Sequence, residues 1–245
     1  MPKTDEHTTH IVYFNGGHRS GHTALEVAAR FGVENLVLLA PNLPKHSEHE
    51  DVRRFRAEVA QHLQVALTYV SPGIGADQFD VALNSLIPGR RFQCATGLKR
   101  DPLRDWLKKS ASPGHDVVYF GFDRGQRRRI QRRSCDLGLR GFHTDYPLAL
   151  WDPLTYTSTS DVGIDPPTYD ARCIGCLRSD SAHWYQVFKE HGKVWKRAKS
   201  FEDKVDEAIL PHVFLEEIEA DFEELHRLDG TLVSDGDSLP CECTT

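Results

Sequence analysis

Short apolar runs alternate with amphipathic segments over the first 150 residues, a pattern typical of strand–helix–strand units around a parallel sheet. The apolar runs predict strands at 11–14, 35–39, 66–70, 117–120 and 146–150. Helical periodicity predicts the helices between them at 23–31, 51–63, 98–109 and 126–137. We therefore expect an α/β fold with a doubly wound parallel sheet of about five strands.

The composition changes near residue 151. Residues 151–172 are rich in Pro, Thr, Ser and Asp and predict a long loop, a kind of segment that is often functional in compact proteins. Helical spacing returns over 182–205 and 213–228, and the last residues, which include two cysteines, are expected to be mobile when nothing is bound. The predicted organisation is an α/β domain at 1–150, a loop with a C-terminal helical extension at 151–228, and a tail at 229–245.

Composition and charge limit the location and the partners. The apolar fraction is 39% and the charged fraction 27%, as in soluble globular proteins. No apolar run approaches the length of a membrane span, and the first residues lack the apolar centre of a signal peptide. We therefore expect a cytoplasmic protein without membrane contact. The net charge of −6 means that any contact with RNA or DNA would need a local basic patch.

The most informative motif joins the first strand to the first helix. The chain passes between them through Asn15-Gly16-Gly17-His18-Arg19-Ser20. Such a junction directs backbone N–H groups and the positive end of a helix toward one point, where a phosphate group would bind. The motif is neither a Walker A loop nor a dinucleotide-binding turn, because it lacks their spacing. An ordinary strand–turn–helix corner is the alternative interpretation.

This motif resembles the PP-loop of the adenine nucleotide alpha hydrolase superfamily, whose pattern is Ser-Gly-Gly-x-Asp-Ser. The resemblance is closest to the branch that contains phosphoadenosine phosphosulfate (PAPS) reductases. Asn15 and Arg19 replace the serine and the aspartate of the pattern. The resemblance implies that residues 15–20 bind ATP or another adenine nucleotide. Loss of the aspartate weakens the case for magnesium-assisted ATP cleavage, whereas Arg19 adds a cation that suits an anionic nucleotide.

Three cysteines form a second candidate site. Cys173-Ile-Gly-Cys176 lies where the long loop meets a helix, and its spacing lets two thiolates face one metal ion while Gly175 allows the tight turn. Cys94 precedes a helix and is expected at the same edge of the sheet as the PP-loop-like motif. Metal or redox chemistry is therefore favoured over disulfides. Zinc, a redox dithiol and buried structural thiols are the alternatives to an iron-sulfur cluster.

The Cys-x-x-Cys segment also resembles the Cys-x-Gly-Cys helix of PAPS reductase-like proteins, which extends the resemblance over roughly residues 11–202. Together, Cys94, Cys173 and Cys176 look like the three-cysteine set of thiolation enzymes in this superfamily. The resemblance implies a 4Fe-4S cluster with one open iron that binds and delivers sulfide. For these three cysteines we expect an iron-sulfur cluster first and a zinc ion second.

Three further cysteines have other interpretations. PAPS reductases carry a reactive cysteine in a Glu-Cys-Gly motif on a mobile tail, and here Glu242-Cys243 is followed by Thr244. Cys243 is therefore a candidate nucleophile, and the alternatives for it and Cys241 are a fourth cluster ligand or a solvated terminus. Cys135 is expected to be a buried, inert thiol on a packed helix face.

Charged and aromatic residues complete the candidates. Asp123 follows the fourth strand and is a candidate to coordinate magnesium or to contact a ribose. Arg129 and Arg133 share one face of the basic helix and are candidates to hold a phosphate or sulfate, whereas the other arginines are expected on a solvated face. His18 is the histidine best placed for catalysis because it lies inside the glycine-rich loop. Trp184 and Trp195 have helical spacing and predict core positions.

These observations lead to two classes of function. The first is a PP-loop enzyme of sulfur chemistry, working either as a sulfurtransferase that adenylates a small or nucleic-acid acceptor, or as an oxidoreductase that attacks a sulfated nucleotide through Cys243. Its expected partners are an adenine nucleotide, a sulfur donor or thiol reductant, and a second copy in a homodimer. The other class is a non-catalytic nucleotide-binding module with a structural metal.

Overall fold

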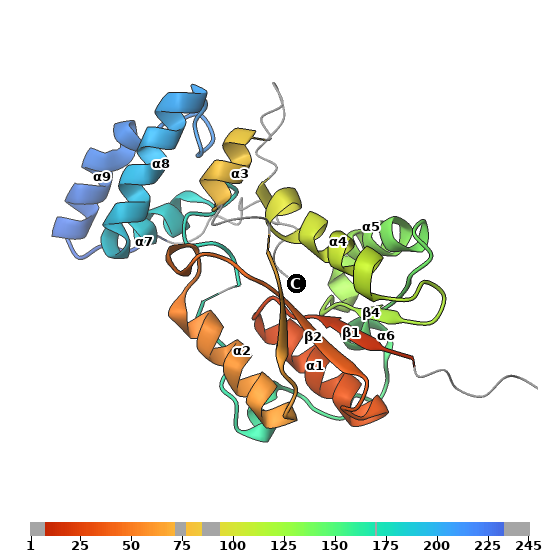
Figure 1. Cartoon of the computed structure of the whole chain (residues 1–245). Helices are drawn as coiled ribbons and strands as arrows, with labels where there is room; N and C mark the ends of the chain where they lie inside the picture. Colours follow the sequence, from red (N-terminus) through yellow and green to blue (C-terminus); the bar gives the residue numbers. More distant parts are fainter. Residues whose placement is uncertain (1–7, 72–76, 85–93, 170, 233–245) are drawn as a thin grey trace, which may run out of the picture.

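A computed structural model describes residues 8–71, 77–84, 94–169 and 171–232 (Figure 1). Its centre is a five-stranded, all-parallel sheet in the order β3-β2-β1-β4-β5. The strands are β1 (His10–Tyr13), β2 (Leu36–Pro41), β3 (Leu67–Val70), β4 (Val117–Tyr119) and β5 (His143–Asp145). The doubly wound parallel fold predicted from the sequence is confirmed.

Helices connect and flank the strands. The α-helices are α1 (His18–Phe31), α2 (Glu50–Leu63), α3 (Gln78–Asn84), α4 (Asp101–Ser110), α5 (Arg127–Gly138), α6 (Pro147–Leu150), α7 (Ser181–Glu190), α8 (Gly192–Val205) and α9 (Leu215–Arg227). Short 3-10 helices are η1 (Lys45–Ser47), η3 (Arg124–Gln126) and η4 (Thr159–Val162), and a π-helix, η2 (Thr96–Arg100), runs directly into α4.

The two faces of the sheet bury different helices, as strand alternation requires. Val12 of β1 and Phe14, the residue after β1, pack into the cluster that contains α1 and α2. Ile11 and Tyr13 point the other way, into the cluster that contains α4 and α5. All four side chains are buried, so the strand is apolar on both faces, as is usual for a parallel sheet covered on both sides.

A separate helical layer adjoins one end of the sheet (Figure 1). Its core joins Trp184 of α7, Trp195 of α8 and Phe222 of α9, which confirms the core positions predicted for both tryptophans. Phe79 of α3 and Leu98 of η2 belong to the same core. The layer is therefore built from the C-terminal helices together with segments that precede α4 in the chain.

The predicted strand at 146–150 is wrong. The last strand ends at Asp145, and Pro147 begins the short helix α6. Proline favours the first turn of a helix, where its missing N–H group has no intrahelical partner to lose. The apolar run indicated burial correctly, since Tyr146 and Ala149 are buried, but burial alone does not distinguish a strand from a helical turn.

Two other segments differ from the sequence prediction. The segment 182–205, which was predicted only to have helical spacing, forms two helices, because α7 ends at Glu190 and α8 begins at Gly192. Glycine is a weak helix former and permits the change of direction there. The helix α3 was not predicted. In the described part of the chain, no helix has the length and apolar character needed to cross a membrane.

Candidate functional site

The glycine-rich loop lies at the switch point of the sheet. β1 pairs with β2 on one side and with β4 on the other, and the helices that follow these two strands, α1 after β1 and α5 after β4, cover opposite faces. The loops that follow β1 and β4 therefore diverge, and ligands of doubly wound folds bind in the resulting crevice at the carboxyl ends of the strands. Residues 15–20 follow β1 at this edge of the sheet, and Gly121, Phe122 and Asp123 follow β4 at the same edge.

Asn15 organises the loop from a fully buried position. Its Oδ1 accepts hydrogen bonds from the Gly17 N–H at 3.0 Å and from the Ser20 Oγ at 2.8 Å. The Ser20 and Gly21 N–H groups bond to the Gly17 carbonyl. His18 and Arg19 follow Gly17 in the first turn of α1, where N–H groups have no intrahelical acceptor and can bind an anion.

Two glycines are required by close packing around this loop. Gly16 has φ +92°, and a Cβ on it would lie 2.7 Å from Val52 Cγ1. A Cβ on Gly121 would lie 2.7 Å from the carbonyl carbon and oxygen of Arg19. The end of β4 therefore touches the backbone at the start of α1, and only glycine fits there.

We expect Gly121→Ala to destabilise the fold by about 1–3 kcal/mol, because backbone atoms at the start of α1 must move to admit the methyl group. Gly138→Ala is the matched control, since a Cβ there meets no atom within 4 Å. Urea unfolding measures both. Equal stability of the two variants would contradict the close contact between β4 and α1.

Asp123 faces the loop across the switch point. Its Oδ2 pairs with Arg19 Nη2 at 2.9 Å, and both side chains are partly exposed. Arg19, in the first turn of α1, thus contacts an acidic residue in the segment that follows β4. Magnesium coordination by Asp123 would have to compete with this ion pair. Its other oxygen, Oδ1, caps η3 by accepting the Gly125 N–H at 2.9 Å.

His18 joins the glycine-rich loop to the long loop. Its Nε2 lies 3.2 Å from Ser158 Oγ. Burial first, and then the nearby His22 and Arg19, lower the pKa of His18 below its usual value. The lowered pKa favours the neutral imidazole, which is held at the first residue of α1.

The long loop is fixed to the outside of the α/β domain. Glu26 of α1 accepts hydrogen bonds from the backbone N–H groups of Thr155 and Tyr156 at 2.9 and 2.7 Å. Asp51 of α2 accepts the Thr168 N–H at 2.6 Å. The loop therefore follows α1 and α2 toward the helical layer, as its trace in Figure 1 shows.

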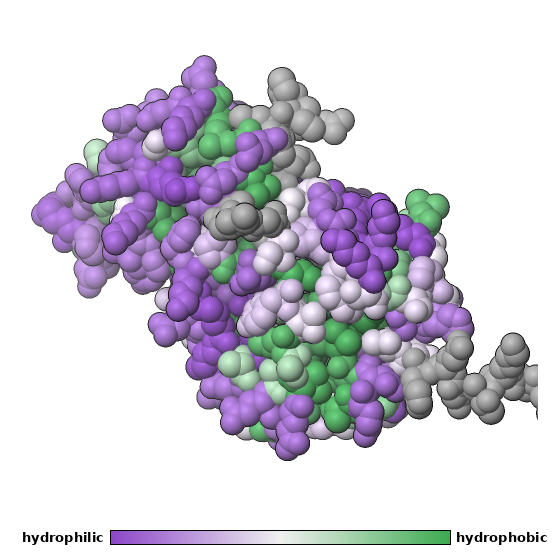
Figure 2. All heavy atoms as spheres, viewed as in Figure 1, coloured by the Kyte–Doolittle hydropathy of each residue, from purple (hydrophilic) through white to green (hydrophobic). Residues whose placement is uncertain are grey.

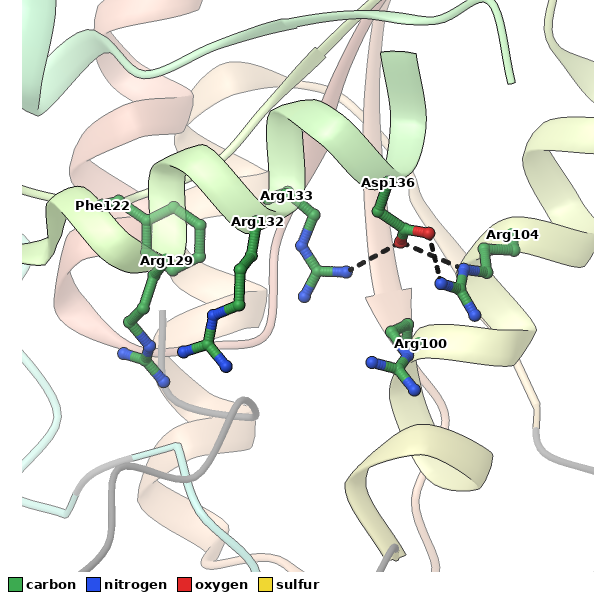
Figure 3. Close-up of a pocket in the computed structure, with 7 residues that line it drawn as sticks. All are labelled: Arg100, Arg104, Phe122, Arg129, Arg132, Arg133 and Asp136. Carbon is green, nitrogen blue, oxygen red and sulfur yellow. Dashed lines mark hydrogen bonds and ion pairs between the residues drawn. The ribbon is translucent and has the colours of Figure 1, made fainter. Parts of the chain in front are cut away.

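A cavity of about 260 Å³ opens beside the β4 loop, between α5 and the η2–α4 segment (Figure 3). The guanidinium carbon (Cζ) of Arg129 lies 5.5 Å from the ring centre of Phe122, and Cζ of Arg133 lies 5.1 Å from the ring centre of Phe120. Asp136 is the acidic residue of the lining and pairs with Arg104. Both Arg129 and Arg133 line this cavity, as their predicted position on one helix face implies. Among the described residues, the lining is Arg100, Arg104, Phe122, Arg129, Arg132, Arg133 and Asp136.

The three candidate metal ligands lie in the helical layer. Cys94 and Cys173 are buried in one hydrophobic cluster, and Cys176 packs against Ala95, the neighbour of Cys94 in the chain. The structure thus brings both parts of the predicted set to one region, beside the π-helix η2. π-Helical turns occur frequently at functional sites.

Hydrogen bonds and close packing hold the Cys173–Cys176 turn. The Ile174 N–H bonds to the Ser47 carbonyl, and the Ile174 carbonyl accepts a hydrogen bond from His183 Nε2 at 2.7 Å. Burial lowers the pKa of His183 to about 4, so this side chain is neutral at pH 7. A Cβ on Gly175 would lie 2.8 Å from atoms of Gln78, Phe79 and Val194. Packing against α3 and α8, rather than the turn itself, therefore requires this glycine.

The chemistry of these cysteines favours a bound metal, whereas the arrangement of the described side chains does not form a metal-binding group. Their burial and sulfur chemistry suit a thiolate-bound metal. Buried Ser47 Oγ and Gln78 Oε1 have no hydrogen-bond partner within the described structure and flank the same turn. However, no group of three or more His, Cys, Asp or Glu side chains among residues 8–71, 77–84, 94–169 and 171–232 has a metal-binding arrangement.

The remaining cysteines differ from each other. Cys135 is exposed on α5, so the prediction of a buried thiol is wrong. The helix turns its apolar face, with Leu137, toward the sheet and leaves Cys135 outside. Cys241 and Cys243 lie outside the described residues, and their predicted roles stay predictions.

The structure also shows a cavity that the sequence did not indicate. About 1000 Å³ in volume, it lies between the start of α2 and the junction of α7 with α8. His49 stacks on Tyr169 at 3.9 Å and meets His191 edge-on at 5.2 Å. Burial, and next the nearby His191, lower the pKa of His49. These residues are far apart in the chain and form no motif, so only the tertiary structure reveals them.

Comparison with known proteins adds no family assignment. A scan against protein-family models finds no match for the chain, and a search of curated proteins finds none either. The resemblance to PAPS reductase-like proteins therefore depends on the glycine-rich loop and the cysteine segment.

Proposed function

We propose that the protein is an adenine-nucleotide-binding enzyme of sulfur chemistry, similar to PAPS reductase-like PP-loop proteins. The observation that carries the proposal is the position of residues 15–20 at the switch point of the sheet, where the first turn of α1 offers N–H groups to a phosphate. Asp123 lies in the loop that follows β4 and the arginine cavity lies beside that loop, and they suit a ribose and further anionic groups. We place the enzyme in the cytoplasm, as a proposal.

In the preferred version the nucleotide is ATP. An oxygen of the acceptor attacks the α-phosphorus, the bond to the β-phosphate oxygen breaks, and pyrophosphate leaves with the electron pair. A sulfur nucleophile then displaces AMP from the acceptor. The residues at the start of α1 would hold the phosphates, and Arg19 would balance their charge. A 4Fe-4S cluster on Cys94, Cys173 and Cys176 would supply the sulfide, and the buried turn beside the π-helix supports these residues as its ligands.

One observation favours the alternative version, a reductase acting on a sulfated adenine nucleotide. The Arg19–Asp123 pair occupies the carboxylate that would otherwise hold magnesium for ATP cleavage. A sulfated nucleotide needs no such cleavage. A thiolate attacks the sulfate sulfur, the S–O bond to the nucleotide phosphate breaks, and the adenosine phosphate leaves with the electron pair. A dithiol reductant then attacks the cysteine sulfur of the thiosulfonate, sulfite leaves, and the dithiol is oxidised to a disulfide. Cys243 is the candidate thiolate for this step.

Truncation after Asp237 separates the two versions, because it removes Cys241 and Cys243. Under the sulfurtransferase version the truncated protein should bind ATP with unchanged affinity in calorimetry and keep its iron. Under the reductase version it should bind PAPS but release no sulfite with a dithiol reductant. The double variant Cys241→Ser and Cys243→Ser is the control, since it keeps the tail and removes only the thiols. If neither ATP nor PAPS binds to the full chain, the proposed function is wrong.

A further inference from the structure

Positive charge is concentrated in one segment of an otherwise acidic chain. Residues 99–140 contain twelve Lys or Arg and five Asp or Glu, a net charge of +7, whereas the whole chain carries −6. The rest of the chain is therefore at −13. The basic segment runs from the end of η2 through α4 and β4 to the end of α5, and Figure 2 shows hydrophilic side chains gathered over α4 and α5.

Many basic side chains of this segment are exposed on the two helices that border the arginine cavity and on the turns beside them. We call this surface the α4–α5 face, and its exposed basic residues are Lys108, Lys109, Arg124, Arg127, Arg128, Arg132 and Arg140. Arg132 belongs both to this face and to the cavity lining, and Figure 3 shows it beside Arg129 on the same side of α5. Six of these seven residues lie outside the cavity lining, so the exposed positive charge is not confined to the cavity.

We infer that the α4–α5 face binds the phosphodiester backbone of a nucleic acid. Naming that nucleic acid as the sulfur acceptor rests on the proposed function. All seven basic residues between 124 and 140 are arginines, whose planar guanidinium groups make two hydrogen bonds to one phosphate. The twelve residues of α5 span about 18 Å, the rise of about five nucleotides along one strand.

The packing of α5 argues against an anionic membrane as the partner. A helix that lies on a bilayer inserts its apolar face between the lipids. In this helix Leu137 is fully buried in the sheet core and Ile130 packs against the same core. The apolar face of α5 therefore packs against the sheet and cannot insert into a bilayer. Its exposed face carries charged side chains, which suit a polyanion that binds at the surface.

The face leads directly to the candidate site. Phe122 lines the arginine cavity, and the next residue, Asp123, pairs with Arg19 at the glycine-rich loop. A backbone bound along α5 would therefore place a nearby base or sugar at the switch point, where the nucleotide is proposed to bind. The charge of the face, and its link to the glycine-rich loop through Phe122 and Asp123, both support a nucleic acid as the acceptor.

Fluorescence anisotropy tests this inference with labelled 20-nucleotide probes of RNA and of DNA, each single-stranded and as a duplex. Binding is measured between 50 and 200 mM salt. The test variant is Arg124→Gln, Arg127→Gln and Arg128→Gln, three exposed residues outside the cavity lining. The matched control is Lys193→Gln, Lys196→Gln and Lys204→Gln, exposed residues of α8 that change the net charge equally. We expect the arginine variant to weaken binding at least tenfold and the lysine variant less than twofold. The plot of log K against log salt should become shallower by about two, since each lost phosphate contact removes about 0.7–0.9.

The result identifies which proposal fails. If no probe binds at 50 mM salt, or if both triple variants lose affinity equally, the α4–α5 face is not a nucleic-acid surface. Binding to vesicles of 30% phosphatidylserine in phosphatidylcholine, without binding to any probe, would overturn it in favour of a membrane. ATP affinity, measured by calorimetry on the same samples, tests the proposed function separately, because none of the six substituted residues lies in the loop 15–20. Nucleic-acid binding without ATP or PAPS binding supports the face and overturns the proposed function.

Discussion

Gly17→Val is expected to weaken binding of the adenine nucleotide by about tenfold to a hundredfold, the loss of one or two hydrogen bonds to a charged group. Gly17 precedes α1, and its N–H already bonds to Asn15 Oδ1. A branched side chain here would lie where a phosphate must approach the N–H groups of the first helical turn. Isothermal titration calorimetry with ATP, and separately with PAPS, measures the effect.

The fold should tolerate this substitution. Gly17 has φ −78° and ψ 154°, an extended conformation that valine adopts readily. Gly16→Ala is the informative comparison, because Gly16 has φ +92° and a Cβ there would collide with Val52. We expect Gly16→Ala to lower the free energy of unfolding by about 1–3 kcal/mol and Gly17→Val to leave it nearly unchanged. A Gly17→Val protein that is stable and binds the nucleotide with full affinity would remove this loop from the site.

Replacing Cys94, Cys173 or Cys176 singly by Ala is expected to remove most of the iron from protein prepared without oxygen. Cluster ligands act as a unit, so each single loss should have nearly the full effect. Iron and acid-labile sulfide analysis, with visible absorbance, gives the measurement. Cys135→Ala is the matched control, because that thiol is exposed on α5 and lies outside the helical layer.

The metal analysis also decides between the alternatives left open by the sequence. Zinc in a colourless protein, lost in the same three variants, would keep the site and replace the cluster. Full metal content in all three variants would contradict a shared site. Buried thiols without any metal would leave these cysteines a packing role, for which the hydrophobic cluster around Cys94 and Cys173 is a sufficient environment.

The sequence alone determined the architecture of the α/β domain. Apolar runs bounded by amphipathic segments predict a covered parallel sheet, because each buried strand must be apolar on both faces, and Ile11–Phe14 satisfies this with four buried side chains. The strand–glycine–helix junction at residues 15–20 was also visible, since its local chemistry is contained within six consecutive positions. The local pattern did not predict the secondary structure at 146–150. The apolar residues there indicate burial, but Pro147 favours the first turn of a helix over a strand.

Only the tertiary structure decided which distant residues meet. The pairing of Arg19 with Asp123 follows from the order of the strands, which places β4 beside β1 although a hundred residues separate them in the chain. The burial of Cys94 with Cys173 depends on a helical layer that combines α3 and η2 with the C-terminal helices. The cavity around His49 and His191 and the position of Arg100 opposite α5 arise in the same way. Periodicity records whether a side chain is buried, whereas its neighbours are fixed by chain topology and packing.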